Sequence, residues 1–179
     1  VFAEHARMID LARVADAAVA MASVGLPPGA IRRLGCAAPP VWGVEGDLVQ
    51  IALNLLVNAV QASENAVEIA VEVAHADGGV ELRVCDRGNG IDPESLPHLF
   101  DPFFTTKPPG HGTGLGLSVC YGIVSAHGGQ IDIESPPGGA LDQLRRWPAA
   151  GLQPDVVAQP AEYRCEVACG YSSVEVRML

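Results

Sequence analysis

The sequence is poor in aromatic side chains and in positive charge. Phe, Trp and Tyr make up 5% of its 179 residues and hydrophobic residues 49%, so Val, Leu, Ile and Ala must fill the core. With 11 Lys and Arg against 21 Asp and Glu, the net charge is −10. Such a surface repels phosphate backbones, and we expect no nucleic-acid partner. The longest apolar stretch, near Leu48 to Val60, is interrupted by Gln50, Asn54 and Asn58. It is too short and too polar to span a bilayer, so we expect no membrane contact by this fragment.

Other features are missing as well. No basic-then-apolar leader opens the chain, so export is not indicated, and the start at Val1–Ala3 without Met suggests an excised fragment. The 5 cysteines are odd in number and scattered, which argues against a disulfide framework. Cys165 and Cys169 could hold a metal on a helix, but no second pair or His follows them, and ordinary thiols are the simpler interpretation.

Hydrophobic periodicity predicts a chain of mixed helices and strands. Helices are expected over Ile9–Ser23, from a cap at Asp47 to about Ser63, and over Leu115–Ala126 before Gly128. Strands are expected at 31–36, 41–44, 67–73, 80–85 and 131–133, with a hairpin turn at 77–79. Alternation within 163–169 and 174–176 indicates a further hairpin near the end of the chain.

Asn54 and Asn58 lie one turn apart on the second predicted helix and share a face with Gln61 and Ala62. The remaining faces are apolar, so this helix is expected to be buried, and buried amides need partners. A side-chain amide oxygen can ligate Mg²⁺, a hard cation that prefers oxygen. The alternative is that neighbouring backbone groups satisfy both amides.

Asp86 ends a predicted strand in which alternate residues of 80–84 are apolar. Period two places Asp86 on the same face as these residues, where a carboxylate is unfavourable unless it is hydrogen-bonded. The amino group of an adenine would supply such a bond, and Gly88 and Gly90 would let the backbone approach a flat ring. The alternative is an ordinary Asp-x-Gly turn at the end of a strand.

The segment Gly110–Leu117 is rich in glycine and runs into a predicted helix that begins near Thr113. Glycines leave room for phosphates, and a helix N-terminus attracts them, with added charge from Lys107 and His111. Flexible loops use the same residues, however, and the segment is neither a Walker loop nor a Rossmann fingerprint. The phenylalanines of Phe100–Phe104 could anchor a lid beside it or simply pack in the core.

Taken in order, these segments resemble the catalytic ATP-binding domain of bacterial two-component sensor histidine kinases, in particular the nitrogen-regulator subgroup. Asn54–Ala62 resembles the N box, Asp86–Gly90 the first glycine box, Leu99–Lys107 the F box and Gly110–Leu117 the second glycine box. The resemblance covers about residues 8 to 137. It implies an α+β fold, the two-layer α/β sandwich called the Bergerat ATP-binding fold, with a mixed, largely antiparallel sheet covered on one face by three helices.

The resemblance also implies roles for the site residues. Asn58 would ligate Mg²⁺ and Asp86 would bind the adenine of ATP, while Asn54, Asn58 and Lys107 are the catalytic candidates for transfer of the γ-phosphate. Asn54 stands where related hydrolysing ATPases carry a Glu, and an amide cannot take a proton from water, which favours phosphotransfer. The implied nucleotide-binding residues are Asn54, Asn58, Gln61, Ala62, Asp86, Gly88, Gly90, Ile91, Phe103, Thr105, Thr106, Lys107, Gly112, Thr113, Gly114, Leu115, Gly116 and Leu117.

The two ends of the chain depart from the family pattern. His5 is not followed by the Pro of the family's phosphoacceptor motif, so residues 1–7 are expected to be a linker remnant, and 8–137 the ATP-binding kinase domain. Residues 138–179 lack the expected final strand of the Ala-Thr-Phe-x-Leu-x-Leu-Pro kind. We interpret them as a divergent tail, either disordered or produced by a reading-frame change.

The predicted function is the donor half of a protein-histidine kinase in two-component signal transduction. Its expected partners are a separate dimerisation domain of the same kinase, which carries the acceptor His in a homodimer, and a response regulator. The expected location is cytoplasmic, although the intact kinase could be membrane-anchored. The alternative is a non-catalytic or degenerate ATP-binding module of the same fold that acts through a partner.

Overall fold

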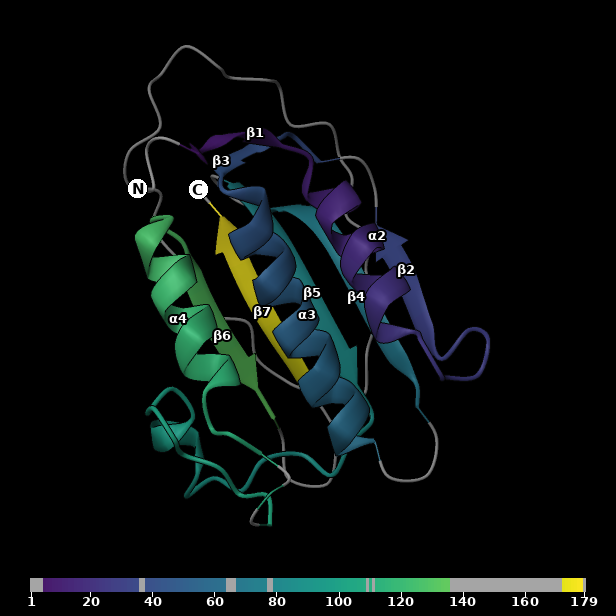
Figure 1. Ribbon diagram of the computed structural model, residues 1–179, viewed down its shortest axis with the longest axis vertical. Helices are drawn as coiled ribbons and strands as arrows, with labels where there is room; N and C mark the ends of the chain where they lie inside the picture. Colours follow the sequence, from purple (N-terminus) through teal and green to yellow (C-terminus); the bar gives the residue numbers. More distant parts are fainter. Residues whose placement is uncertain are drawn as a thin grey trace.

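The computed structural model describes residues 5–35, 38–63, 67–76, 79–108, 110, 112–135 and 172–178. One face of a five-stranded sheet is covered by α2 (Leu11–Ala22), α3 (Glu45–Ala62) and α4 (Gly116–Ala126) (Figure 1). The strand order across the sheet is β2 (Ile31–Gly35), β4 (Ile69–Ala76), β5 (Gly79–Asp86), β7 (Ser172–Met178) and β6 (Gln130–Glu134).

The strand pairing is mixed but mostly antiparallel. β2 pairs with β4 in parallel, and the other three pairs of the large sheet are antiparallel. A separate two-stranded sheet joins β1 (Arg7–Ile9) to β3 (Val41–Gly43), and a short 3₁₀ helix, η1, covers Leu96–His98. The predicted α+β two-layer sandwich with three covering helices is confirmed.

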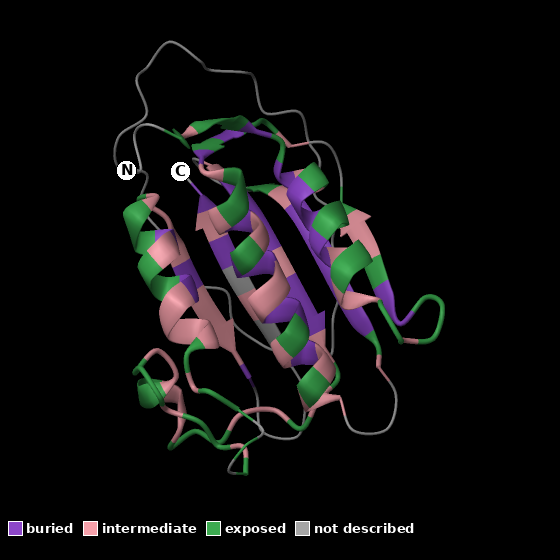
Figure 2. Cartoon of the chain, viewed as in Figure 1, coloured by how far each residue is buried: buried purple, intermediate pink, exposed green. Residues whose placement is uncertain are grey.

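The core lies between the helices and the inner face of the sheet (Figure 2). Alternate residues of the central strands, such as Val71, Leu82 and Val84, are buried against the apolar side of α3 around Leu55. Period two therefore leaves Asp86, the last residue of β5, on this same inner face. None of the helices in the described ranges is long and apolar enough to cross a bilayer.

Some helix boundaries differ from the predicted ones. Ile9 belongs to β1 rather than to the first helix, because the side chain of Asp10 caps α2 by accepting from the N–H of Ala12. Asp47 is not the cap of α3: that helix begins at Glu45, and Asp47 lies in its first turn, where a negative charge favours the helix dipole. α4 begins at Gly116, later than the expected start near Thr113.

β7 is the main departure from the prediction. It lies between β5 and β6, with Val174 opposite both Val84 and Ile133. The predicted domain boundary at residue 137 leaves this strand outside the domain, whereas the structure places it inside the sheet. The predicted hairpin with 163–169 involves residues outside the described ranges, and both hydrogen-bonding edges of β7 are already engaged by β5 and β6.

Candidate functional site

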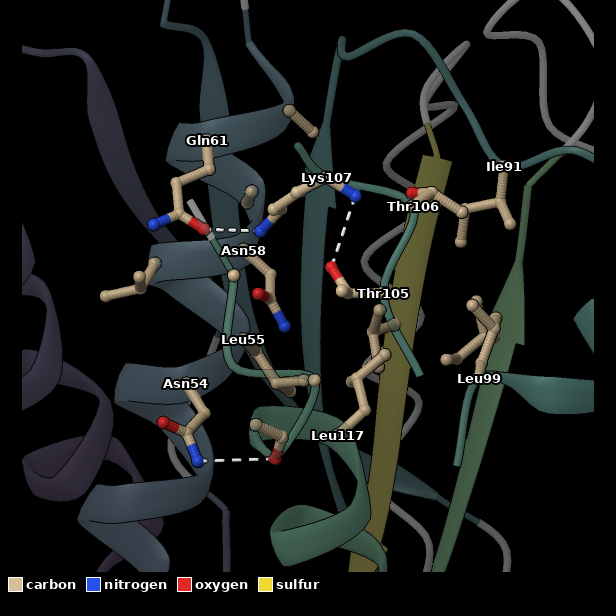
Figure 3. Close-up of a pocket in the computed structure, with 18 of the residues that line it drawn as sticks. Asn54, Leu55, Asn58, Gln61, Ile91, Leu99, Thr105, Thr106, Lys107 and Leu117 are labelled. Carbon is tan, nitrogen blue, oxygen red and sulfur yellow. Dashed lines mark hydrogen bonds between the residues drawn. The ribbon is translucent and has the colours of Figure 1, made fainter. Parts of the chain in front are cut away.

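A cavity of about 830 Å³ lies between α3, the end of β5 and the loops that precede α4 (Figure 3). Its volume is in the range of sites that bind small molecules. Asn58 from α3 and Asp86 from β5 contribute to its wall, as do three glycines in the loop before α4 and at its first residue: Gly112, Gly114 and Gly116. These residues come from three separate motifs, and the fold brings them together.

Most of the predicted site residues line this cavity. They are Asn54, Asn58, Gln61, Ala62, Asp86, Gly90, Ile91, Thr105, Thr106, Lys107, Gly112, Thr113, Gly114, Gly116 and Leu117. Three others, Gly88, Phe103 and Leu115, are not among its lining residues. His111 lies outside the described residues.

Gly88 lies in the turn after β5, beside the cavity. A Cβ built on it would lie 2.7 Å from the Cβ and the carbonyl oxygen of Ala62, and 2.7 Å from Oδ1 of Asp86. Glycine is therefore needed here so that the turn after β5 can approach the last residue of α3. Gly88 shapes the site by this close approach.

Phe103 faces solvent instead of the cavity. Its side chain is 73% exposed, and its φ of 68° lies in the left-handed region that a bulky residue seldom adopts. The N–H of Phe103 donates to the carbonyl of Gly114 at 2.9 Å, which joins the F-box segment to the second glycine box. The neighbouring Phe100 contacts Tyr121 of α4, with ring centroids 5.3 Å apart, so this segment is anchored on α4.

Asp86 is a partly buried acid at the cavity end of β5. Burial raises the pKa of its carboxyl above the ordinary value of 3.8, and a hydrogen bond from the N–H of Gly88, 2.8 Å from Oδ1, partly offsets this effect. A carboxylate has room for several donors. Asp86 thus retains the capacity to accept a hydrogen bond from a ligand in the cavity.

The two asparagines of α3 have different surroundings. Nδ2 of Asn54 donates to the carbonyl of Gly116 at 3.4 Å and lies 3.7 Å from Sγ of Cys120. Burial raises the pKa of the Cys120 thiol to about 11, so the sulfur is neutral at physiological pH. For the nitrogen of Asn54, the alternative interpretation therefore applies: neighbouring groups satisfy its hydrogen-bonding capacity.

The amide of Asn58 points into the open part of the cavity, one turn further along α3 (Figure 3). It hydrogen-bonds to no other residue in the part of the chain that the structure describes. A side-chain amide at the wall of a cavity can present its oxygen to Mg²⁺, which binds oxygen and keeps several waters. Asn58 therefore fits the predicted metal site, although no cluster of three or more His, Cys, Asp or Glu lies in the described residues. Cys165 and Cys169 lie outside them.

Lys107 closes one side of the cavity. Its ammonium group donates to Oε1 of Gln61 on α3, and its backbone N–H donates to Oγ1 of Thr105 at 3.2 Å (Figure 3). Burial lowers the pKa of Lys107 from its ordinary value of 10.5. A cation in a partly desolvated position is stabilised by a nearby anion, so this side of the cavity favours a phosphate group.

The cavity also has apolar walls made by residues outside the predicted site set. Their side chains come from neighbouring positions on the motif elements and from strands far away in the sequence: Leu55, Val84, Leu99, Ile133 and Val174. The alternation in β5 could have identified Val84, which shares a face with Asp86. No local signal links Val174 to the site, because the pairing of β7 with β5 and β6 places it there.

The fold and the cavity together define an ATP-binding domain of the class that the sequence resembles. The model of the histidine kinase-, DNA gyrase B-, and HSP90-like ATPase family matches residues 43–146. The chain therefore belongs to this ATPase family.

Individual relatives narrow the comparison to sensor kinases. Sensor histidine kinase ZraS of Klebsiella oxytoca is 40% identical over 139 residues, which cover 74% of this chain and 29% of the relative. Sensory histidine kinase/phosphatase NtrB of Rhizobium meliloti (strain 1021) is 38% identical over 113 residues, 54% of this chain and 29% of the relative. The resemblance to sensor histidine kinases of the nitrogen-regulator subgroup is confirmed.

A solved structure shares the fold. Full-length ShkA in complex with AMPPNP superposes with a TM-score of 0.65 at 21% sequence identity, covering 97% of this chain and 30% of that one. At this identity the match establishes the fold alone. The chain spans less than a third of the length of ZraS, NtrB and ShkA.

Proposed function

We propose that this domain binds ATP together with Mg²⁺ and donates the γ-phosphate to a histidine on a separate dimerisation domain. The observation that carries the proposal is the cavity shared by Asp86, Asn58 and the glycines Gly112, Gly114 and Gly116. The names of ZraS and NtrB as sensor histidine kinases, and the AMPPNP bound to ShkA, support it.

Each group in the cavity has a distinct role in this proposal. The carboxylate of Asp86 would accept a hydrogen bond from the amino group of adenine, and the amide oxygen of Asn58 would hold Mg²⁺. Lys107 and the N–H groups at the start of α4 would contact the phosphates. When bound, Mg²⁺ neutralises charge on the phosphates, so the domain needs to supply positioning rather than a nucleophile.

Asn54 favours transfer over hydrolysis. A hydrolysing site needs a base for the attacking water, and an amide cannot serve as one. Its nitrogen is instead bound to the carbonyl of Gly116, so Asn54 holds the start of α4 beside the phosphate region. No described residue contradicts this role.

The partners and the location belong to the same proposal. The phosphate would go to the dimerisation domain of the same kinase, in a homodimer, and then to a response regulator. This part of the protein would act in the cytoplasm.

The test has two stages. The chain is first titrated with ATP in the presence and absence of Mg²⁺ and is then mixed with the isolated histidine-bearing domain of the same kinase. We expect Mg²⁺-dependent binding, followed by an acid-labile phosphohistidine on the added domain. Binding without transfer would favour the non-catalytic module, and an absence of nucleotide binding would refute the proposal altogether.

A further inference from the structure

The ends of α3 and α4 that lie away from the cavity are joined through His127. Its Nε2 accepts a hydrogen bond from the backbone N–H of Val44 at 3.1 Å, and its Nδ1 lies 2.8 Å from the carbonyl oxygen of Ile123. Because Nε2 accepts and a carbonyl can only accept, Nδ1 carries the proton. Val44 precedes α3 and His127 follows α4, so one side chain links the two helices.

The start of α3 lacks the usual means of capping itself. Val44 occupies the N-cap position and has no side-chain hydrogen bond to offer. In a capping box, the N–H of the N-cap residue is bonded by an acidic or amide side chain three residues later, which here would be Asp47. The N–H of Val44 is bonded by His127 from the other helix instead.

Gly43 leaves the space that the imidazole occupies. A Cβ built on Gly43 would lie 2.9 Å from Cδ2 and 3.0 Å from Nε2 of His127. Any side chain at residue 43 would therefore push the ring away from Val44. The contact thus depends on a glycine from β3 as well as on the histidine.

The end of α4 is closed by backbone groups. Gly128 adopts a φ of 70°, and the N–H of Gly129 donates to the carbonyl of Val124 at 2.9 Å, as in a Schellman motif. The imidazole is therefore not required to end the helix. Its bond to Val44 instead helps to fix the position of α4 relative to α3.

Contacts between the same two helices are longer near the cavity. Asn54 lies 3.4 Å from the carbonyl of Gly116, and Sγ of Cys120 lies 3.9 Å from the carbonyl of Ile51. The bond of Asn54 is long compared with an ordinary N–H bond near 3 Å, and a thiol is a weak donor. The stronger connection is at the far end of α4, about 16 Å from the cavity for a helix of this length, so a small tilt there would move Gly116 relative to Asn58.

We infer that His127 is a positioning residue, which fixes α4 against α3 and so holds the second glycine box at its working distance from Asn54 and Asn58. This inference rests on the proposed function, because its consequence is measured as affinity for a nucleotide with Mg²⁺. Residues of both helices must contact that ligand at the same time. The affinity is therefore sensitive to their separation even when the fold remains intact.

Two matched substitutions separate the bond to Val44 from the bond to Ile123. His127→Gln places an amide oxygen near the position of Nε2, where it can accept from Val44, whereas His127→Asn reaches only the position of Nδ1 and can donate to Ile123. We expect His127→Asn to lower the affinity for Mg²⁺–AMPPNP about tenfold and His127→Gln to stay within about twofold of the native protein. Equal affinities of the two variants, or the reverse order, would overturn the inference.

Gly43→Ala approaches the same contact from the opposite side. Its methyl group should displace the imidazole and lower the affinity by a similar factor. Combined with His127→Asn it should cause no further loss, since both changes break one contact. Additive losses would show that the two residues act separately and would contradict the inference.

Nuclear magnetic resonance tests the link without nucleotide. We expect the ¹⁵N shifts of His127 to show a proton on Nδ1 and none on Nε2, with slow hydrogen exchange at the N–H of Val44. A proton on Nε2 would refute the link whether or not nucleotide binds. If the native protein showed the expected tautomer but bound no Mg²⁺–AMPPNP, the proposed function would fail while the link itself stood.

Discussion

Two acidic side chains of β5 face opposite sides of the sheet and have opposite surroundings. Glu81 lies on the outer face, is 7% exposed, and forms ion pairs with Arg83 at 2.8 Å and with Arg177 at 3.0 Å. Asp86 lies on the inner face at the cavity, where it accepts from the N–H of Gly88. Within the described ranges, no Lys, Arg or His forms an ion pair with Asp86.

The two acids differ in how far nearby cations compensate their charge, and this difference indicates different roles. Cations from β5 and β7 compensate the charge of Glu81, so this residue joins strands and has no evident task for a ligand. Asp86 receives little compensation from the protein, and burial raises its pKa. A partly buried acid with a raised pKa and little compensating charge, beside a cavity, is typical of a binding site.

The largest effect is expected from Asp86→Asn. The substitution removes the charged acceptor, and we expect ATP affinity to fall about 100-fold, in line with the loss of a hydrogen bond to a charged group. Stability without nucleotide should stay equal or rise, because a partly desolvated charge is gone. Titration calorimetry measures the ATP affinity, and thermal unfolding measures the stability without nucleotide. A large loss of stability would show that Asp86, like Glu81, has a structural role.

Glu81→Gln should have the opposite profile. Breaking its pairs leaves Arg83 and Arg177 undercompensated, and we expect the free energy of unfolding to fall by about 2 kcal/mol, with ATP affinity unchanged. Urea unfolding measures the loss. The control is Glu68→Gln, since the exposed pair of Glu68 with Arg87 is worth at most about 0.5–1 kcal/mol. Equal effects of the two substitutions would contradict the assigned role of Glu81.

Asn58→Ala tests the second polar group of the cavity. It should lower ATP affinity about tenfold when Mg²⁺ is present, through loss of an oxygen ligand, and leave the affinity nearly unchanged in EDTA. Calorimetry in both buffers gives the two values. If the loss is the same with and without Mg²⁺, Asn58 contacts the nucleotide without the metal.

The smallest effect is a dependence on pH from Asp86. Because its folded-state pKa lies above the ordinary 3.8, the stability linked to this group is fully present below that value and is lost as pH rises through the folded pKa. ATP affinity should change in the other direction, falling as pH is lowered through the folded pKa, because the protonated carboxyl loses acceptor capacity. Neither trend should be present in Asp86→Asn, and an unchanged pH profile in that variant would assign the titration to another group.

The sequence predicts the inner half of the site well because its signals are local. Helical spacing places Asn54 and Asn58 on one face, and strand alternation places Asp86 on the core face, as the structure shows. Phe103 carries no such periodic signal, and the helical pattern that begins at Leu115 does not place that residue at the cavity wall. Their membership of the site was implied only by the motifs, and the structure places Phe103 at the surface.

Contacts between distant segments could not be predicted. Nothing near Val174 indicates that it pairs with Val84 and Ile133, and nothing near His127 indicates Val44. Both depend on how the sheet and helices assemble. A reading-frame change before β7 remains a prediction, which translation of the neighbouring frames of the gene would test by restoring or failing to restore the family's final strand.

In the proposed site, the Asp86 carboxylate accepts a hydrogen bond from the amino group of adenine. Inosine triphosphate carries an oxygen in place of that amino group and a proton on the neighbouring N1, so calorimetric titration of the native protein and Asp86→Asn with ATP and inosine triphosphate tests how this edge of the purine is recognised. We expect the native protein to prefer ATP by at least about tenfold and the preference to disappear in Asp86→Asn. Equal affinities of the native protein for both nucleotides, or an undiminished preference in the variant, would contradict this role of Asp86.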